Sequence, residues 1–155
     1  MSGIVGQGSK SGIIGAKDST ANLSDYETGD FSPNLYDSAG DRSTSSELGS
    51  YIRIGALVHI QCYFFTNASS SGTSMRVGNL PFTSASGNQD YASGACSYAE
   101  NMSITAGHSI NARVQKINTY LWLDLWDSTG GVTTLSGSEY GTSGQLQVTV
   151  TYRIA

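Results

Sequence analysis

The sequence predicts an all-β protein: an antiparallel β-sandwich or jelly roll with an extended N-terminal arm. Glycine occupies 19 of the 155 positions, and only 13% of the residues are charged. Serine and threonine are abundant, and this composition favours strands and turns over helices. Several segments alternate apolar and polar residues with the period of two that is typical of strands, and turn-forming residues separate them. No segment of ten residues has the periodicity of a helix.

Residues 1–17 are predicted to form an extended anchoring arm. Two aliphatic pairs, Ile4-Val5 and Ile13-Ile14, each stand between glycines. Such a segment cannot form a core alone, because glycine loses much backbone entropy on ordering and the apolar surface is small. We expect the four aliphatic side chains, Ile4, Val5, Ile13 and Ile14, to insert into apolar grooves of a neighbouring subunit, with the backbone adding to a sheet edge. The alternative is an arm that folds back on its own domain.

Residues 18–155 are predicted to form the β-sandwich domain. Composition changes at about residue 18, where a segment with many acidic and few basic residues begins. Residues 51–65 alternate as a strand does, and Gly55 predicts a bend that divides this stretch in two. We expect both faces of this stretch to be partly covered. One face carries Ala56, Val58, Ile60, Cys62 and Phe64.

The next elements are a loop over residues 67–72 and a short strand over residues 75–77. Pro81 is expected to end this strand region, because proline cannot donate a hydrogen bond to a neighbouring strand. Residues 98–104 fit a short helix or a strand equally well. No other helix is predicted here.

Three further strands follow, over residues 109–117, 120–126 and 145–154. The last has the most regular alternation, which predicts one packed face and one polar face. The large side chains of residues 120–126 bury well only between two surfaces, so this strand is expected to be covered on both sides. The predicted inward residues are Ile110, Ala112, Val114, Leu121, Leu123, Leu125, Leu146, Val148, Val150, Tyr152 and Ile154.

The charge balance argues against several classes of partner. The formal net charge is −4 and the pI is near 4.9, whereas proteins that track nucleic-acid phosphates need clustered Lys and Arg. The sequence has no apolar run long enough to cross a membrane and no pattern typical of a signal peptide. We therefore predict neither nucleic-acid binding nor membrane insertion.

The cysteines and histidines do not predict a metal site or any cofactor. Cys62 and Cys96 lack the close spacing of zinc ligands, and only His59 and His108 could join them. Cys62 lies on the apolar face of a predicted strand and is expected to be a small buried hydrophobic residue. A disulfide between the two cysteines remains open, although an intracellular chain would keep both thiols reduced.

The search for catalytic residues predicts a protein that is not an enzyme. Asp124 and Asp127 lie near two tryptophans, as carboxylates do in some glycosidases, but Asp127 also fits an ordinary turn. Neither His59 nor His108 has a recognisable catalytic partner, and the sequence has no nucleophile elbow, phosphate-binding loop, zinc-protease motif or calcium loop.

Aromatic residues form the other candidate site. We predict that Tyr120, Trp122 and Trp126 belong to a subunit interface or to a surface that binds a glycan, and we favour the interface because aromatic side chains anchor interfaces and this strand is expected to be covered on both sides. The residues considered exposed are Tyr36, Tyr91, Tyr98, Tyr140, Trp122 and Trp126.

Three ordered blocks of the sequence resemble a module of tail-fibre tips and other surface proteins of tailed bacteriophages. In that module, an acidic Tyr-Glu-x-Gly opening precedes a Tyr-x-Arg-Ile-Gly strand and a Gly-Leu-Pro-Phe loop. The chain departs from the pattern by Phe31, where tryptophan is common, and by Asn79, which is inserted in the last block. The arm resembles, more weakly, the starts of short virion proteins of aquatic phages. The matching blocks are residues 26–35, 49–60 and 78–83.

The resemblance implies a trimeric β-sandwich on the outside of a virus particle. Its partners would then be further copies of the chain and other virion proteins of the capsid or tail. Because the sequence lacks a coiled coil or fibre repeat, we favour a capsid decoration protein that is held by its arm. A tail-fibre adhesin that recognises a host surface polysaccharide is the alternative.

Overall fold

The computed structural model describes residues 26–127 and 130–155, which form an antiparallel β fold with one short helix. The strands join one sheet in the order β1-β4-β5-β11-β7-β8-β9-β6-β2-β3, and β10 pairs with β9. No helix in these ranges has the length and apolar character that a membrane crossing requires. The elements are β1 (Tyr26–Phe31), β2 (Asn34–Asp37), β3 (Gly40–Asp41), β4 (Thr44–Ile54), β5 (Leu57–Thr66), β6 (Arg76–Gly78), β7 (Ala92–Glu100), β8 (Ser109–Val114), β9 (Leu121–Asp127), β10 (Gly131–Thr134), α1 (Gly137–Tyr140) and β11 (Gln145–Arg153).

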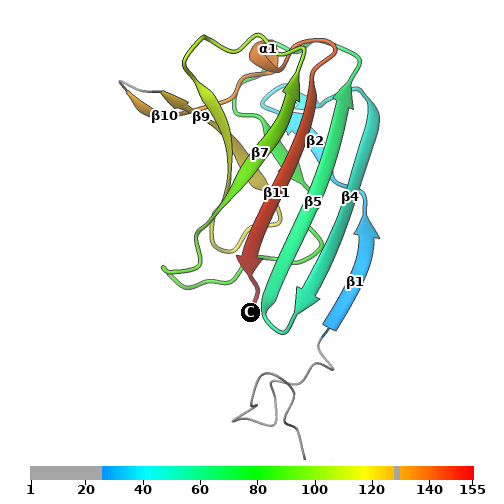
Figure 1. The fold of residues 1–155 in the computed structure, drawn as a ribbon, viewed down its shortest axis with the longest axis vertical. Coiled ribbons are helices and arrows are strands. Elements are labelled where there is room, and N and C mark those ends of the chain that lie inside the picture. Colours follow the sequence, from blue (N-terminus) through cyan, green and yellow to red (C-terminus); the bar gives the residue numbers. More distant parts are fainter. Residues whose placement is uncertain (1–25, 128–129) are drawn as a thin grey trace, which may run out of the picture.

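The sheet curls into two facing layers (Figure 1). We call β1, β4, β5, β11 and β7 the front layer, and β8, β9, β6, β2 and β3 the back layer. The Glu47 carboxylate on β4 accepts a hydrogen bond of 3.0 Å from the backbone N–H of Leu35 on β2. This bond joins the two layers near β1, the edge strand of the front layer. The predicted all-β antiparallel class is confirmed, and the two layers give it the form of a sandwich.

The core fills the space between the layers with the side chains that alternation predicted. Leu146, Val148 and Val150 on β11 are buried, as are the inward residues of β5, β8 and β9. Met75, Leu80 and Leu135, from the connecting segments, belong to the same cluster. The period of two therefore identified the buried face of each of these strands.

The β4–β5 hairpin bends at Gly55, as predicted, because this residue adopts a φ of +59° that favours glycine. Both faces of β5 are partly covered, as predicted, because the inward residues are buried and the outward His59, Tyr63 and Phe65 are half-buried. The outward residues form the outside of the front layer, and Leu57 is 48% exposed.

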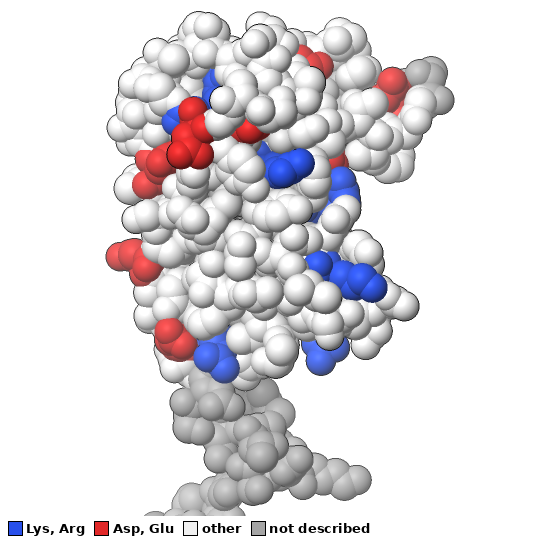
Figure 2. Space-filling view, turned by 180° about the vertical axis from the view of Figure 1, so that it is seen from behind, with Lys and Arg blue, Asp and Glu red and all other residues white. Residues whose placement is uncertain are grey.

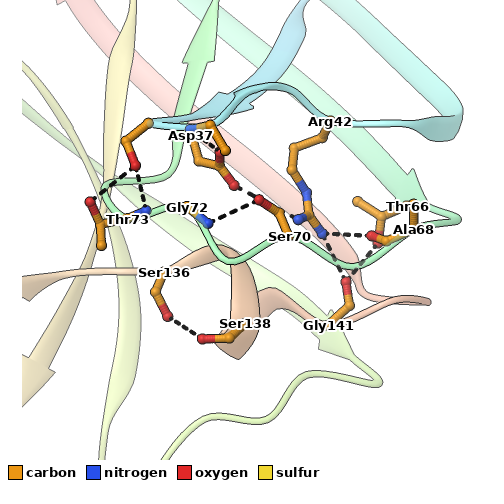
Figure 3. Close-up of polar contacts among 12 residues, drawn as sticks. Asp37, Arg42, Thr66, Ala68, Ser70, Gly72, Thr73, Ser136, Ser138 and Gly141 are labelled. Atoms are coloured by element: carbon orange, nitrogen blue, oxygen red, sulfur yellow. Dashed lines mark hydrogen bonds and ion pairs between the residues drawn. The ribbon is translucent and has the colours of Figure 1, made fainter.

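A buried polar network closes the end of the sandwich near α1 (Figure 3). The Arg42 side chain is 2% exposed and the Asp37 side chain 1% exposed, and their charged groups lie 3.8 Å apart. Arg42 also donates hydrogen bonds of 2.9 Å to the carbonyl oxygens of Ala68 and Gly141. The guanidinium thus ties the β3–β4 turn to two other connecting segments.

Two glycines leave room for the Asp37 carboxylate. A Cβ atom at Gly72 would lie 2.0 Å from an Asp37 oxygen, and one at Gly137 would lie 2.5 Å from the other oxygen. Burial lowers the pKa of the Arg42 guanidinium, whereas the nearby Asp37 carboxylate and Tyr140 raise it. The network is therefore closely packed around a charge pair that is removed from water.

Ile117 adopts a strained backbone conformation at the turn between β8 and β9. Its φ is +56°, which is unfavourable for a β-branched residue, and its side chain is 64% exposed. We expect Ile117→Asn to raise the free energy of unfolding by about 1 kcal/mol, because asparagine tolerates this region better. Urea unfolding measures the change. Ile117→Val keeps the branched side chain and should change little, and equal stabilities of all three proteins would contradict the assignment of strain.

The two cysteines are free thiols, one on each side of β11. Val148 pairs with Cys62 on β5 and with Cys96 on β7. Strands lie about 4.8 Å apart, so two strand spacings separate these cysteines by more than the roughly 7 Å that a disulfide spans. The disulfide that the sequence left open is therefore not formed within the chain, and the expected burial of Cys62 is confirmed.

Burial raises the pKa of both cysteine thiols from 9.0 to about 12. We expect the native protein at pH 8 to resist alkylation by iodoacetamide, and the protein unfolded in urea to take up two labels, as mass spectrometry would show. Because the unfolded thiols ionise first, this contribution to stability is complete below pH 9 and is lost as pH rises toward 12. Rapid labelling of the native chain would contradict this prediction.

Candidate interaction surfaces

The outward side chains of the front layer form cross-strand rows. One row runs Leu48, Tyr63, Gln147 and Tyr98, because these residues are paired across β4, β5, β11 and β7. A second row contains Ile52, and a third contains Ile54 and Leu57. Exposed apolar side chains of this kind, contiguous on one sheet face, are typical of interaction sites. The exposed large apolar side chains of the face are Tyr26, Leu48, Ile52, Ile54, Leu57 and Tyr98.

A groove of about 830 Å³ crosses this face. Its floor follows the row Asp30, Ser50, Gln61 and Thr149, which is paired in register across four strands. Small and polar side chains in this row leave a depression beside the larger Leu48 row. We call it the front groove. It is lined by Asp30, Phe31, Ser32, Glu47, Leu48, Gly49, Ser50, Gln61, Cys62, Tyr63, Ser97, Gln147, Val148 and Thr149.

The front groove is acidic. Its lining contains Asp30 and Glu47 and no Lys or Arg. Glu47 is bound to the Leu35 backbone, whereas Asp30 is exposed and makes no hydrogen bond or ion pair with any residue that the structure describes. Asp30 is thus the free negative charge of the groove.

Hydrogen bonds fix the side chains near one end of the groove. Tyr63 donates a hydrogen bond of 2.6 Å to Gln145, and Gln145 donates one of 3.2 Å to Glu100. Tyr98 also donates to Glu100. This chain of contacts orders side chains of β5, β11 and β7, so that part of the face is ordered before any partner arrives.

The outer face of the back layer carries a different arrangement, which we call the Arg76 ladder. Arg113 on β8 pairs with Trp122 on β9, Trp122 pairs with Arg76 on β6, and Arg76 pairs with Tyr36 on β2. Tyr120 joins them, with its ring 5.9 Å from the ring of Trp122 and 6.4 Å from that of Tyr36. Register between four strands therefore builds the ladder.

Arg76 lies among three aromatic rings. Its guanidinium carbon is 3.8 Å from the centre of the Trp122 ring, 5.2 Å from that of Tyr120 and 5.8 Å from that of Tyr36. These cation–π contacts hold the charge in place. Its buried Nε atom has no hydrogen-bond partner in the described part of the chain, and neither does the indole N–H of Trp122.

The neighbouring Arg113 is neutralised and Arg76 is not. Arg113 donates hydrogen bonds of 2.6 Å and 3.2 Å to the two oxygens of Asp124. Asp124 is buried, and Asp127, the other carboxylate considered for a catalytic pair, lies 3.7 Å from His108. The two carboxylates contact different side chains, Arg113 and His108, so they do not form a pair that faces a common substrate.

The predicted aromatic site is brought together only in part. Tyr120 and Trp122 belong to the Arg76 ladder, and Trp126 lies four residues beyond Trp122 on the same face, 56% exposed. The expectation that this strand is covered on both sides holds for part of its length, because Asp124 on the outward face is buried and Trp122 is half-buried, whereas Trp126 is exposed. Tyr140, expected among the exposed aromatics, is fully buried because α1 places it in the core.

Sequence reasoning missed Arg76, although a basic residue in a short strand facing a tryptophan strand could have indicated it. The arm residues Ile4, Val5, Ile13 and Ile14 lie outside the described residues. The described residues contain no group of three or more His, Cys, Asp or Glu side chains that could hold a metal ion.

Charge is unevenly distributed over the face seen from behind. Figure 2 shows Lys and Arg side chains at separate places over this face, and a row of acidic side chains along its left edge with others near the top. Broad uncharged areas separate them. The back layer thus offers localised positive charge on a largely neutral surface.

The described fold is similar to part of a phage protein of known structure. No protein-family model matches the sequence, and no curated protein is significantly similar to it. The crystal structure of Dettilon tailspike protein (gp208) matches with a TM-score of 0.73 and 18% sequence identity. The match covers 86% of this chain, which spans about a quarter (25%) of the length of that structure. At this identity, the likeness concerns the fold.

Proposed function

We propose that this chain is a non-enzymatic structural module of a bacteriophage particle that works as a homo-oligomer, expected to be a trimer. The observation that carries the proposal is the match of 86% of the chain to a region of a tailspike protein. The three sequence blocks that resemble tail-fibre modules lead to the same class of particle protein by an independent route.

The exposed apolar side chains of the front layer support the homo-oligomer. Leu48 is 63% exposed, and Ile52, Ile54 and Leu57 lie on the same face. Interfaces between copies typically bury such side chains. In a symmetric homo-oligomer, each copy would cover the exposed apolar side chains of a neighbouring copy.

The place on the particle is the part of the proposal that needs a direct test. The tailspike likeness favours the tail, whereas the absence of a predicted shaft led us to expect a capsid decoration protein. Antibodies against the purified protein, labelled with gold, would be imaged on intact particles of the phage that encodes the chain. Label on tails supports the tail assignment, label over the head supports capsid decoration, and unlabelled particles overturn the proposal.

The N-terminal arm is the segment that we expect to attach the protein to the particle. We propose that residues 1–17 bind other virion proteins through Ile4, Val5, Ile13 and Ile14. A chain that lacks residues 1–17 should keep its circular dichroism spectrum and oligomeric state but no longer incorporate into particles. Incorporation at the full-length level would remove the anchoring role.

A tail-fibre adhesin is a second candidate function, favoured by the aromatic rings of Tyr120, Trp122 and Trp126 on one face. Binding to a glycan array that is reduced by Trp126→Ala would support it. The same polysaccharides, incubated with the protein, should release no new reducing ends, because we propose no catalytic residues. Release of reducing ends would contradict the non-enzymatic assignment.

A further inference from the structure

Two charged side chains of opposite sign lack partners within the described residues. The other cations there, Arg42, Arg53, Arg113, Lys116 and Arg153, each contact a carboxylate or an amide oxygen. Arg76 has only aromatic neighbours. Asp30 is likewise the described carboxylate that makes no hydrogen bond or ion pair. Arg76 lies on the back layer and Asp30 on the front layer, so they cannot meet within one chain.

The surfaces around these two residues have complementary chemistry. Asp30 is the outward carboxylate of the front groove, whose lining contains no Lys or Arg, whereas the Glu47 carboxylate is bound to the Leu35 backbone of the back layer. Arg76 lies among Tyr36, Tyr120 and Trp122. Arginine, tyrosine and tryptophan are the residue types that contribute most to binding energy in protein interfaces. A groove with an acidic floor is suited to receive such side chains.

We infer that the front groove of one copy binds the Arg76 ladder of a second copy, with Asp30 of the first paired to Arg76 of the second. The inference rests on the proposed homo-oligomer and names its contact surfaces. The contact of 3.8 Å with the Trp122 ring restricts the Arg76 guanidinium, so little side-chain freedom is lost when a carboxylate binds to it. The exposed apolar rows beside the groove would be covered in the same contact.

A contact between two different surfaces of the same chain is heterologous. Each copy then has one free groove and one free ladder, and repetition of the contact closes a ring when the rotation between copies allows it. Three copies would form such a ring in the expected trimer. An isologous contact between two front layers would instead bring the Asp30 carboxylates onto the same interface.

Charge reversal tests the pairing in the full-length chain. Native mass spectrometry and light scattering over a range of concentrations would compare the wild type, Arg76→Glu, Asp30→Arg and the double variant. Each single reversal places like charges together and should raise the dissociation constant at least about tenfold. The double variant restores opposite charges and should recover most of the wild-type affinity.

Matched controls separate the pairing from general effects. Lys116→Glu reverses a half-buried cation that belongs to neither the front groove nor the Arg76 ladder and should leave the oligomer unchanged. Ile52→Asp, on the front face, should dissociate it, whereas Val132→Asp, on β10, should not. Arg76→Gln serves in place of the reversal if Arg76→Glu loses its native circular dichroism spectrum, and it should also weaken the oligomer.

The outcomes distinguish this inference from the proposed function. Single reversals that leave the oligomer intact overturn the inference, as does a double variant that fails to recover. Neither result changes gold labelling of the particles. A wild-type chain that stays monomeric at every concentration overturns both this inference and the proposed homo-oligomer, and labelling then tests the virion assignment alone.

Discussion

Replacing Arg42 with methionine is expected to lower the free energy of unfolding by about 3–5 kcal/mol. The substitution leaves the Asp37 carboxylate buried without its cation, and it frees the carbonyl oxygens of Ala68 and Gly141 from their hydrogen bonds. Removing one partner of a buried charge pair lowers the free energy of unfolding by far more than the intact pair contributes to it. The remaining charge is then buried with neither a partner nor water to stabilise it. Urea unfolding followed by circular dichroism measures the loss.

Arg53→Met is the matched control, because Arg53 also contacts a carboxylate, 3.6 Å away on Glu27, but at the surface. That pair is accessible to water, so the control should cost less than about 1 kcal/mol. Adding Asp37→Asn to Arg42→Met should recover part of the loss, since the uncompensated charge is removed. Equal effects of Arg42→Met and Arg53→Met would show that the buried network contributes nothing special to stability.

The second large effect is expected at Gly94, which ends the pairing of β7 with β11 and also pairs with Ala112 on β8. A Cβ atom there would lie 2.2 Å from the Thr149 carbonyl oxygen and 2.1 Å from a Val150 methyl carbon. One contact is to backbone, so the strands themselves must separate. Gly94→Ala should lower the free energy of unfolding by about 1–3 kcal/mol, the usual cost of overpacking.

Ser93→Ala is the control for Gly94→Ala, because Ser93 is the exposed neighbour on the same strand. It should change stability by no more than about 0.5 kcal/mol. Melting temperatures and urea midpoints would both be compared. A Gly94→Ala protein as stable as the Ser93→Ala protein would show that β7 can move away from β11 at little cost.

The strands that carry alternating apolar residues could be predicted from the sequence. The strands without this alternation could not be predicted. β5, β8, β9 and β11 place their predicted residues in the core. β1 and β7 are rich in small or polar residues, and almost no residue of either is fully buried. Pairing with β4 and β11 makes them strands, and such pairing joins segments that are distant in the sequence.

The candidate surfaces were predictable to a similar degree. Tyr120 and Trp122 follow from the aromatic content of one strand. Arg76 and Tyr36 join them through the register of β2, β6 and β9, which no local pattern encodes. The Asp37–Arg42 pair was missed because its burial depends on α1 and on the segment around Gly72, which cover a turn that alone would be exposed.

Both ends of the described body lie at the same pole. Tyr26 pairs with Ile54, and the backbone N–H of Ile154 donates to the carbonyl oxygen of Ala56, so both ends flank the β4–β5 turn (Figure 1). Any polypeptide joined before β1 or after β11 therefore leaves from that pole. The opposite pole, with α1, carries neither end of the described residues, so a reporter or affinity tag fused after Ala155 would leave that pole unobstructed.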